Sequence, residues 1–294
     1  SLVGSERCIR DRLYARRDYS GTTDTSLHDS ETKEGDIRLY LEPTALIRAR
    51  ILASERQVDQ DEDGTDSRTR RQGVGASVQV DKVTNLDVEL ARTDIHREDA
   101  DGTIEEVTGP SWGLSLTRAR PLGDLSLSFS SDPGTDGRRE NLTFGRTLER
   151  PDYKLALSIG ATHFRDNYDP IFQISYDRRF SAVSQFQTSL RRAGITSDDG
   201  DEAISTSVQA SYNRQLGELS SLGANLNYRE TEVQTGDDQD GQSFSLSVSY
   251  SRALASELSL VAGASVIRSK QQNGERDEDE RVWLGISRSF DWLP

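Results

Sequence analysis

The sequence lacks the features that mark several common classes of protein. Among 294 residues there is one cysteine, Cys8, so no intrachain disulfide can form, and because Cys8 is not the first residue it offers no lipoprotein anchor. No run of about 18 apolar residues occurs, which excludes transmembrane helices. A net charge of -14 argues against nucleic acid as a partner, since phosphate binding needs a basic surface.

A short motif recurs along the second half of the chain. Tyr176-Asp177-Arg178 returns as Tyr212-Asn213-Arg214, as Tyr250-Ser251-Arg252 and, without the tyrosine, as Ile286-Ser287-Arg288. Each copy closes a run in which apolar and polar residues alternate. From Ile204 to Tyr212 the even positions are apolar or methyl-bearing, and the odd positions between them are serine or glutamine. A period of two predicts β-strands.

The strands have one apolar face that ends in an aromatic residue and a cation, and one face of small hydroxyl groups. A membrane β-barrel needs this pattern: lipid outside, water inside, and an aromatic girdle with snorkelling arginines at the headgroups. The girdle residues are predicted to be Tyr176, Arg178, Tyr212, Arg214, Tyr250, Arg252 and Arg288. A soluble β-sandwich would also alternate, but it offers no reason for a cation to recur at one depth on the apolar face.

Long acidic connections alternate with short turns along the whole chain. The long ones are predicted at 21–36, 59–69, 98–107, 131–138, 165–170, 196–203, 233–241 and 271–280, and the short ones near 43–44, 84–85, 121–123, 150–152, 182–183, 217–218 and 255–256. Barrels of the bacterial outer membrane have short periplasmic turns and longer outer loops. We therefore expect an all-β fold, a single closed antiparallel barrel over residues 1–294 with about sixteen strands and both termini periplasmic. The first strand is placed at about 7–19, and fourteen or eighteen strands are alternatives.

The last strand carries a second signal. Residues 282–292 resemble the C-terminal assembly signal of outer-membrane proteins, with Gly285 as its glycine and Phe290 and Trp292 as its terminal aromatics, although two residues follow Trp292. As architecture, the chain resembles the putative β-barrel porins. The resemblance implies the outer membrane of a Gram-negative bacterium, with its lipid, lipopolysaccharide and barrel-assembly machinery as partners. No leader for secretion opens the chain, so we expect the sequence to be a processed or trimmed form.

The polar face is expected to line a lumen. Its small residues include Ser115, Ser128, Ser207, Ser211, Ser245 and Ser247. In the same register Arg48 and Arg50 would face the lumen opposite Asp87 and Glu89, an arrangement that resembles the transverse field of general diffusion porins. The alternative is that these charges pair and fill the barrel.

The sequence offers little for other chemistry. The segment that begins with Asp59, Asp61 and Asp63 resembles the start of an EF-hand calcium loop. Its twelfth position is Arg70 rather than glutamate, and strands rather than helices flank it. These residues are therefore at most a weak calcium site. We expect no cofactor, no other metal site and no enzymatic activity.

Two functions remain at this stage. The first is an outer-membrane channel for polar solutes or for exported polysaccharide, with the acidic loop 21–36 setting the bore. The second is a non-conducting barrel that anchors or assembles an envelope complex. A periplasmic export or envelope complex is a candidate partner in both cases.

Overall fold

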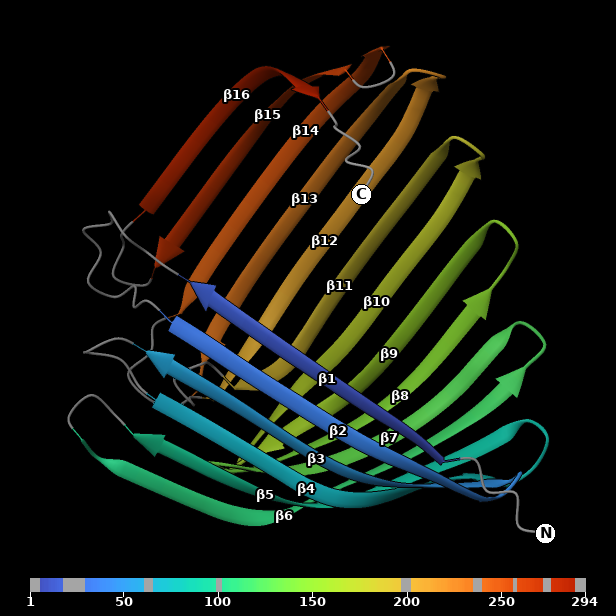
Figure 1. Ribbon diagram of the computed structural model, residues 1–294, viewed down its shortest axis with the longest axis vertical. Coiled ribbons are helices and arrows are strands. Elements are labelled where there is room, and N and C mark those ends of the chain that lie inside the picture. Colours follow the sequence, from blue (N-terminus) through green and yellow to red (C-terminus); the bar gives the residue numbers. More distant parts are fainter. Residues whose placement is uncertain are drawn as a thin grey trace, which may run out of the picture. The chain divides into compact units, whose positions relative to one another are not determined.

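A computed structural model describes residues 6–17, 30–60, 66–98, 102–196, 202–234, 240–255, 258–271 and 276–288, with backbone alone described in 6–17 and at 30, 60, 255 and 271. These residues form sixteen strands (Figure 1): β1 Glu6–Arg17, β2 Ser30–Thr44, β3 Ile47–Gln60, β4 Asp66–Gln79, β5 Thr84–Glu98, β6 Ile104–Arg120, β7 Gly123–Gly134, β8 Gly137–Glu149, β9 Tyr153–Phe164, β10 Asn167–Ser181, β11 Ser184–Thr196, β12 Glu202–Gly217, β13 Ser220–Val233, β14 Gly241–Ala255, β15 Leu258–Gln271 and β16 Arg276–Arg288.

Each strand hydrogen-bonds to the next along the chain, in a single sheet ordered β1 to β16. The ladders with a resolved register, such as β1 with β2 and β15 with β16, are antiparallel. The all-β antiparallel architecture is therefore confirmed, whereas closure of the barrel, its total strand count and the periplasmic termini stay predictions. Within the described residues no helix is long and apolar enough to cross a membrane.

Contacts divide the chain into two compact units. Unit 1 comprises Ser1–Gly145, Gly160–Pro170 and Ile195–Glu202; unit 2 comprises Arg146–Ile159, Ile171–Gly194 and Ala203–Pro294. The single domain expected from the sequence stays a prediction.

The short turns lie within a few residues of their predicted places. Six connect described strands, at 45–46, 80–83, 121–122, 150–152, 182–183 and 218–219, and the seventh, at 256–257, lies outside the described residues. In the turn at 80–83 the Val83 N–H and the Thr84 hydroxyl donate to the Asp81 carboxylate, at 2.7 and 3.0 Å. These bonds hold the pKa of Asp81 below its usual value.

Several of the predicted long connections are shorter in the structure, and residues 276–280 of the predicted connection 271–280 belong to β16. Strand β2 begins at Ser30, so Glu31, Glu34 and Asp36 belong to a strand and not to a loop 21–36. This strand is extended because it pairs along its length with both β1 and β3. The predicted loops at 131–138 and 165–170 are two-residue turns at 135–136 and 165–166. Polar, charged composition resembled a loop there, but sheet hydrogen bonds do not depend on the polarity of the side chain.

The strand pairing in unit 2 places polar side chains on one face of the sheet and apolar side chains on the other. Directly opposed residues lie on the same face of a sheet. One row across β12–β16 joins Ser211, Asn225, Ser247, Ser265 and Arg281. The adjacent row on the other face joins Tyr212, Ala224, Val248, Ala264 and Val282. The predicted alternation is thus preserved along these rows across five strands. The register shifts in these ladders, between Gln215 and Gly217 and between Ala253 and Ala255, lie beside the short turns.

The recurring arginines follow a regular stagger. Arg214 pairs with Leu222, which pairs with Tyr250, two residues before Arg252. Arg252 in turn pairs with Leu260, which pairs with Ile286, two residues before Arg288. With a rise of about 3.3 Å per residue and about 4.8 Å between strands, a line through the arginines is inclined by roughly 35° to the hydrogen-bonding direction.

Candidate functional site

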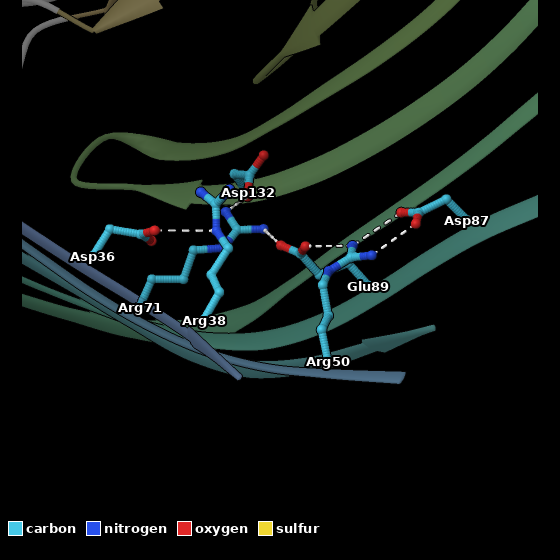
Figure 2. Close-up of polar contacts among 7 residues, drawn as sticks. All are labelled: Asp36, Arg38, Arg50, Arg71, Asp87, Glu89 and Asp132. Atoms are coloured by element: carbon cyan, nitrogen blue, oxygen red, sulfur yellow. Dashed lines mark hydrogen bonds and ion pairs between the residues drawn. The ribbon is translucent and has the colours of Figure 1, made fainter. Parts of the chain in front are cut away.

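An ion-paired cluster lies on one face of unit 1. Arg50 on β3 donates to Asp87 at 2.7 and 2.9 Å and to Glu89 at 2.7 Å, both on β5 (Figure 2). The bond to Asp87 uses both nitrogens of the guanidinium fork and both carboxylate oxygens, which is the strong geometry for this pair. The side chain of Arg50 is only 15% exposed and that of Glu89 22%. The cluster is therefore partly shielded from water.

A glycine makes this contact possible. Arg50, Gly75 and Glu89 occupy one row across β3, β4 and β5, so the guanidinium must cross β4 to reach Glu89. A Cβ at Gly75 would lie 2.7 Å from the guanidinium carbon of Arg50. The absence of a side chain at Gly75 leaves the space in which the arginine lies.

Arg71 extends the cluster to β7. It donates to Glu89 and to Asp132, each at 2.8 Å, so Glu89 accepts from two arginines on different strands (Figure 2). Arg38 contacts Asp36 at 3.2 Å at the β2 side. We call Asp36, Arg38, Arg50, Arg71, Asp87, Glu89 and Asp132 the charged cluster.

The predicted transverse field, with arginines facing carboxylates in the lumen, is not what the structure shows for Arg50. Arg50 was expected to face Asp87 and Glu89 across a lumen, but it contacts them directly, two strands away on the same sheet. Arg48 does not join them: it pairs with Glu42 at 2.7 Å, and its side chain is 57% exposed. The charges neutralise each other along one wall because strand spacing brings residues two strands apart within reach of an arginine.

Part of the charged cluster was not predicted from the sequence. Asp36 and Asp132 were assigned to loops, and Arg71 followed a segment also assigned to a loop. A signal for Arg71 was present, since it continues the alternation of Gly73, Gly75 and Ser77 on the polar face of β4. No local pattern marks Asp132, which depends on the tight turn after β7.

Buried side chains accompany the cluster on this face of unit 1. Leu52 and Val58, on the same face of β3 as Arg50, are buried. Thr93 and Ser111 are also buried, and their hydroxyl groups are 2.7 Å apart. Part of this wall is therefore packed rather than open.

The predicted lumen serines lie on faces that also carry amides and hydroxyls. In unit 1, Ser115 opposes Ser128, and the Ser128 hydroxyl lies 2.5 Å from that of Thr143. In unit 2 Asn225 opposes both Ser211 and Ser247. The remaining two, Ser207 and Ser245, oppose Arg229 and Asn227. Their role in lining a lumen stays a prediction.

The tyrosines of the repeated motif make a repeated contact. Ser184 donates to the Tyr212 hydroxyl at 3.2 Å, and the Tyr250 hydroxyl donates to Ser220 at 3.3 Å. Ser184 and Ser220 each begin the strand after a short turn, so the bond fixes the tyrosine ring beside that turn. Tyr176 instead packs against Tyr153, with ring centroids 6.1 Å apart. Tyr153 was not predicted as a girdle residue, although it directly follows the turn at 150–152.

The other predicted sites are only partly described. Asp59 lies in β3 and contacts Lys33 and Gln57, while Asp61 and Asp63 lie outside the described residues. Gly285 lies in β16, and Phe290 and Trp292 also lie outside the described residues. Within the part of the chain that the structure describes, no group of three acidic, histidine or cysteine side chains is placed to hold a metal.

The sheet is similar to several solved structures. The copper transporter OprC superposes with a TM-score of 0.56 at 10% identity, over 99% of this chain and 62% of that one. The siderophore receptor PiuA from Acinetobacter baumannii gives 0.51 at 11% identity, over 90% and 59%, and the FrpB iron transporter from Neisseria meningitidis gives 0.51 at 8%, over 91% and 57%. The chain has the fold of outer-membrane β-barrel proteins.

The predicted resemblance to outer-membrane barrels is thereby confirmed at the level of the fold, and the outer membrane of a Gram-negative bacterium is where proteins with this fold lie. The chain spans about three-fifths of the length of these three structures. No family model and no curated protein matches the sequence. A sequence identity of 8 to 11% shows that the fold is shared, and it does not show that the function is shared.

Proposed function

We propose that the chain closes into a sixteen-stranded barrel in the outer membrane and passes small polar solutes through a water-filled lumen. The observation that carries this proposal is the division of the sheet into an apolar face and a polar face. On the apolar side, Val282, Leu284 and Ile286 are strongly exposed, which suits contact with lipid. The polar side would then form the lumen.

Closure is supported by the stagger of the arginines. Barrel strands tilt by about 35 to 45° from the barrel axis. A row of residues inclined by roughly 35° to the hydrogen-bonding direction would therefore lie parallel to the plane of the membrane. In such a barrel Arg214, Arg252 and Arg288 would share one depth near the short turns, where a cation can reach the headgroups.

Transport of a polar solute is supported by the width that sixteen strands would give. Barrels of sixteen strands leave an aqueous channel, whereas those of eight are filled by side chains. Exported polysaccharide is one specific class of polar solute that such a channel would pass. Lipopolysaccharide, the barrel-assembly machinery and an envelope complex are the partners that this location implies.

A second candidate is a non-conducting barrel that anchors envelope machinery. The charged cluster and the buried Leu52, Val58 and Thr93 favour it, because they occupy the wall that would otherwise be open. The two candidates differ in whether water and ions cross the barrel.

Single-channel recording in planar bilayers tests the proposal. We expect stepwise conductance from the purified, refolded protein, and replacement of Arg71 by serine is expected to shift selectivity toward cations because Glu89 and Asp132 lose a positive partner. Arg70→Ser is the matched control, because Arg70 is the adjacent residue on β4, projects from the other face and contacts Glu55.

Equal shifts from Arg70→Ser and Arg71→Ser would show that the polar face was misassigned. Folded protein that gives no conductance would instead favour the anchoring role.

A further inference from the structure

Unit 2 carries a hollow on its polar face that is lined by side-chain amides and hydroxyls. The hollow has a volume of about 490 Å³ and lies over β9–β13, with Lys154 of β9 also in its lining. Three opposed pairs define it, and we call them the amide panel: Asp177 with Gln187, Gln209 with Asn227, and Ser211 with Asn225. Four of the six side chains are primary amides.

We infer that the amide panel binds neutral polyhydroxyl solutes, of the chemical class of a short oligosaccharide, as they pass along the wall. The inference rests on the proposed channel function and adds a solute class to it. A primary amide offers two donor hydrogens and an acceptor oxygen, and a sugar hydroxyl is both donor and acceptor. A row of amides can therefore bond to a chain of hydroxyls whichever way each hydroxyl points.

Much of the panel's hydrogen-bonding capacity is available to a solute. Among the described residues, the side chains of Gln209, Ser211 and Asn225 make no hydrogen bond to another protein group. Asn227 makes one long bond, at 3.3 Å to Ser245, which leaves its carbonyl oxygen and one hydrogen.

The two charged side chains that line the hollow already have protein partners, which disfavours ionic solutes. Lys154 contacts Glu149 at 2.5 Å, and the carboxylate of Asp177 accepts from Gln187 at 2.7 Å and from Gln185 at 3.2 Å. The panel holds no arginine, so it lacks the fork that recognises carboxylates and phosphates. Unit 1 differs, since its polar face carries the charged cluster.

The dimensions of the panel suit more than one sugar ring. Four strands span about 14 Å across the sheet, and two successive inward residues are about 7 Å apart along a strand. Hydroxyl groups on neighbouring rings could thus be bonded at the same time, which adds affinity without any single strong contact.

Saturation-transfer NMR on the full chain, folded in detergent, tests the inference with maltotriose as the neutral probe and gluconate and lysine as charged probes. We expect maltotriose to bind and the charged probes to bind more weakly. The triple variant Gln209→Ala, Asn225→Ala, Asn227→Ala is expected to weaken maltotriose binding by about tenfold or more, because several hydrogen bonds are lost together. The control is Asn85→Ala with Asn141→Ala, which removes amides from the polar face of unit 1.

Heat-modifiable gel mobility verifies that each variant is folded. Failure of the folded wild-type protein to bind maltotriose would overturn the inference, as would an equal loss in the control or equally tight binding of gluconate. Because binding is measured without a bilayer, maltotriose binding by a protein that gives no conductance would support the panel while excluding the channel.

Discussion

Replacing Arg50 with alanine is expected to lower the free energy of unfolding by about 2 kcal/mol. The substitution leaves Asp87 without its two-pronged partner and removes one of the two arginines on Glu89. Two carboxylates would then lie close together in a partly shielded position with only Arg71 to offset them. Urea titration of the protein in detergent or lipid, followed by tryptophan fluorescence or gel mobility, measures the loss.

Arg48→Ala is the matched control for this prediction. Arg48 projects from the same face of β3, two residues away, but its side chain is mostly exposed and its partner is Glu42. An exposed ion pair contributes about 0 to 1 kcal/mol, so the control should lose much less than Arg50→Ala. Equal losses would show that the charged cluster adds nothing beyond an ordinary surface pair.

Replacing Gly160 with valine is expected to prevent the barrel from folding. A Cβ at this position would overlap the carbonyl oxygen of Leu142 and lie 2.9 Å from the Cα of Thr143. Both obstacles are backbone atoms of β8, so neither can rotate away, and β8 and β9 would have to separate. Overpacking that a side chain relieves costs about 1 to 3 kcal/mol, and a backbone clash should exceed that range. The folded fraction on heat-modifiable gels is the measurement.

Gly35→Val provides the comparison, because Gly35 lies inside β2 and a Cβ there meets nothing within 4 Å. This variant should fold as the wild type does, since valine is also a better strand former than glycine. A folded Gly160→Val protein would mean that β8 and β9 are not as close as the structure places them.

The sequence by itself determined the elements that depend on local periodicity. The runs ending at Tyr212 and Tyr250 identify strands and their two faces, because successive side chains of a strand point to opposite sides. The short turns were also readable, since residues such as Pro121 and Pro151 restrict the backbone in a known way. The spacing of Arg214, Arg252 and Arg288 reflects the stagger between strands, although this became clear only from the register.

Only the tertiary structure decided what the charged residues do. Asp36 and Asp132 have the composition of loop residues, yet they lie in strands, because pairing with neighbouring strands satisfies the backbone whatever the side chain. The joining of Arg50 to Glu89 across Gly75 depends on three strands in one register, and no pattern within a single strand encodes it. Charge pairing depends on distance in space, and distance between strands is set by the ladders rather than by the order of residues along the chain.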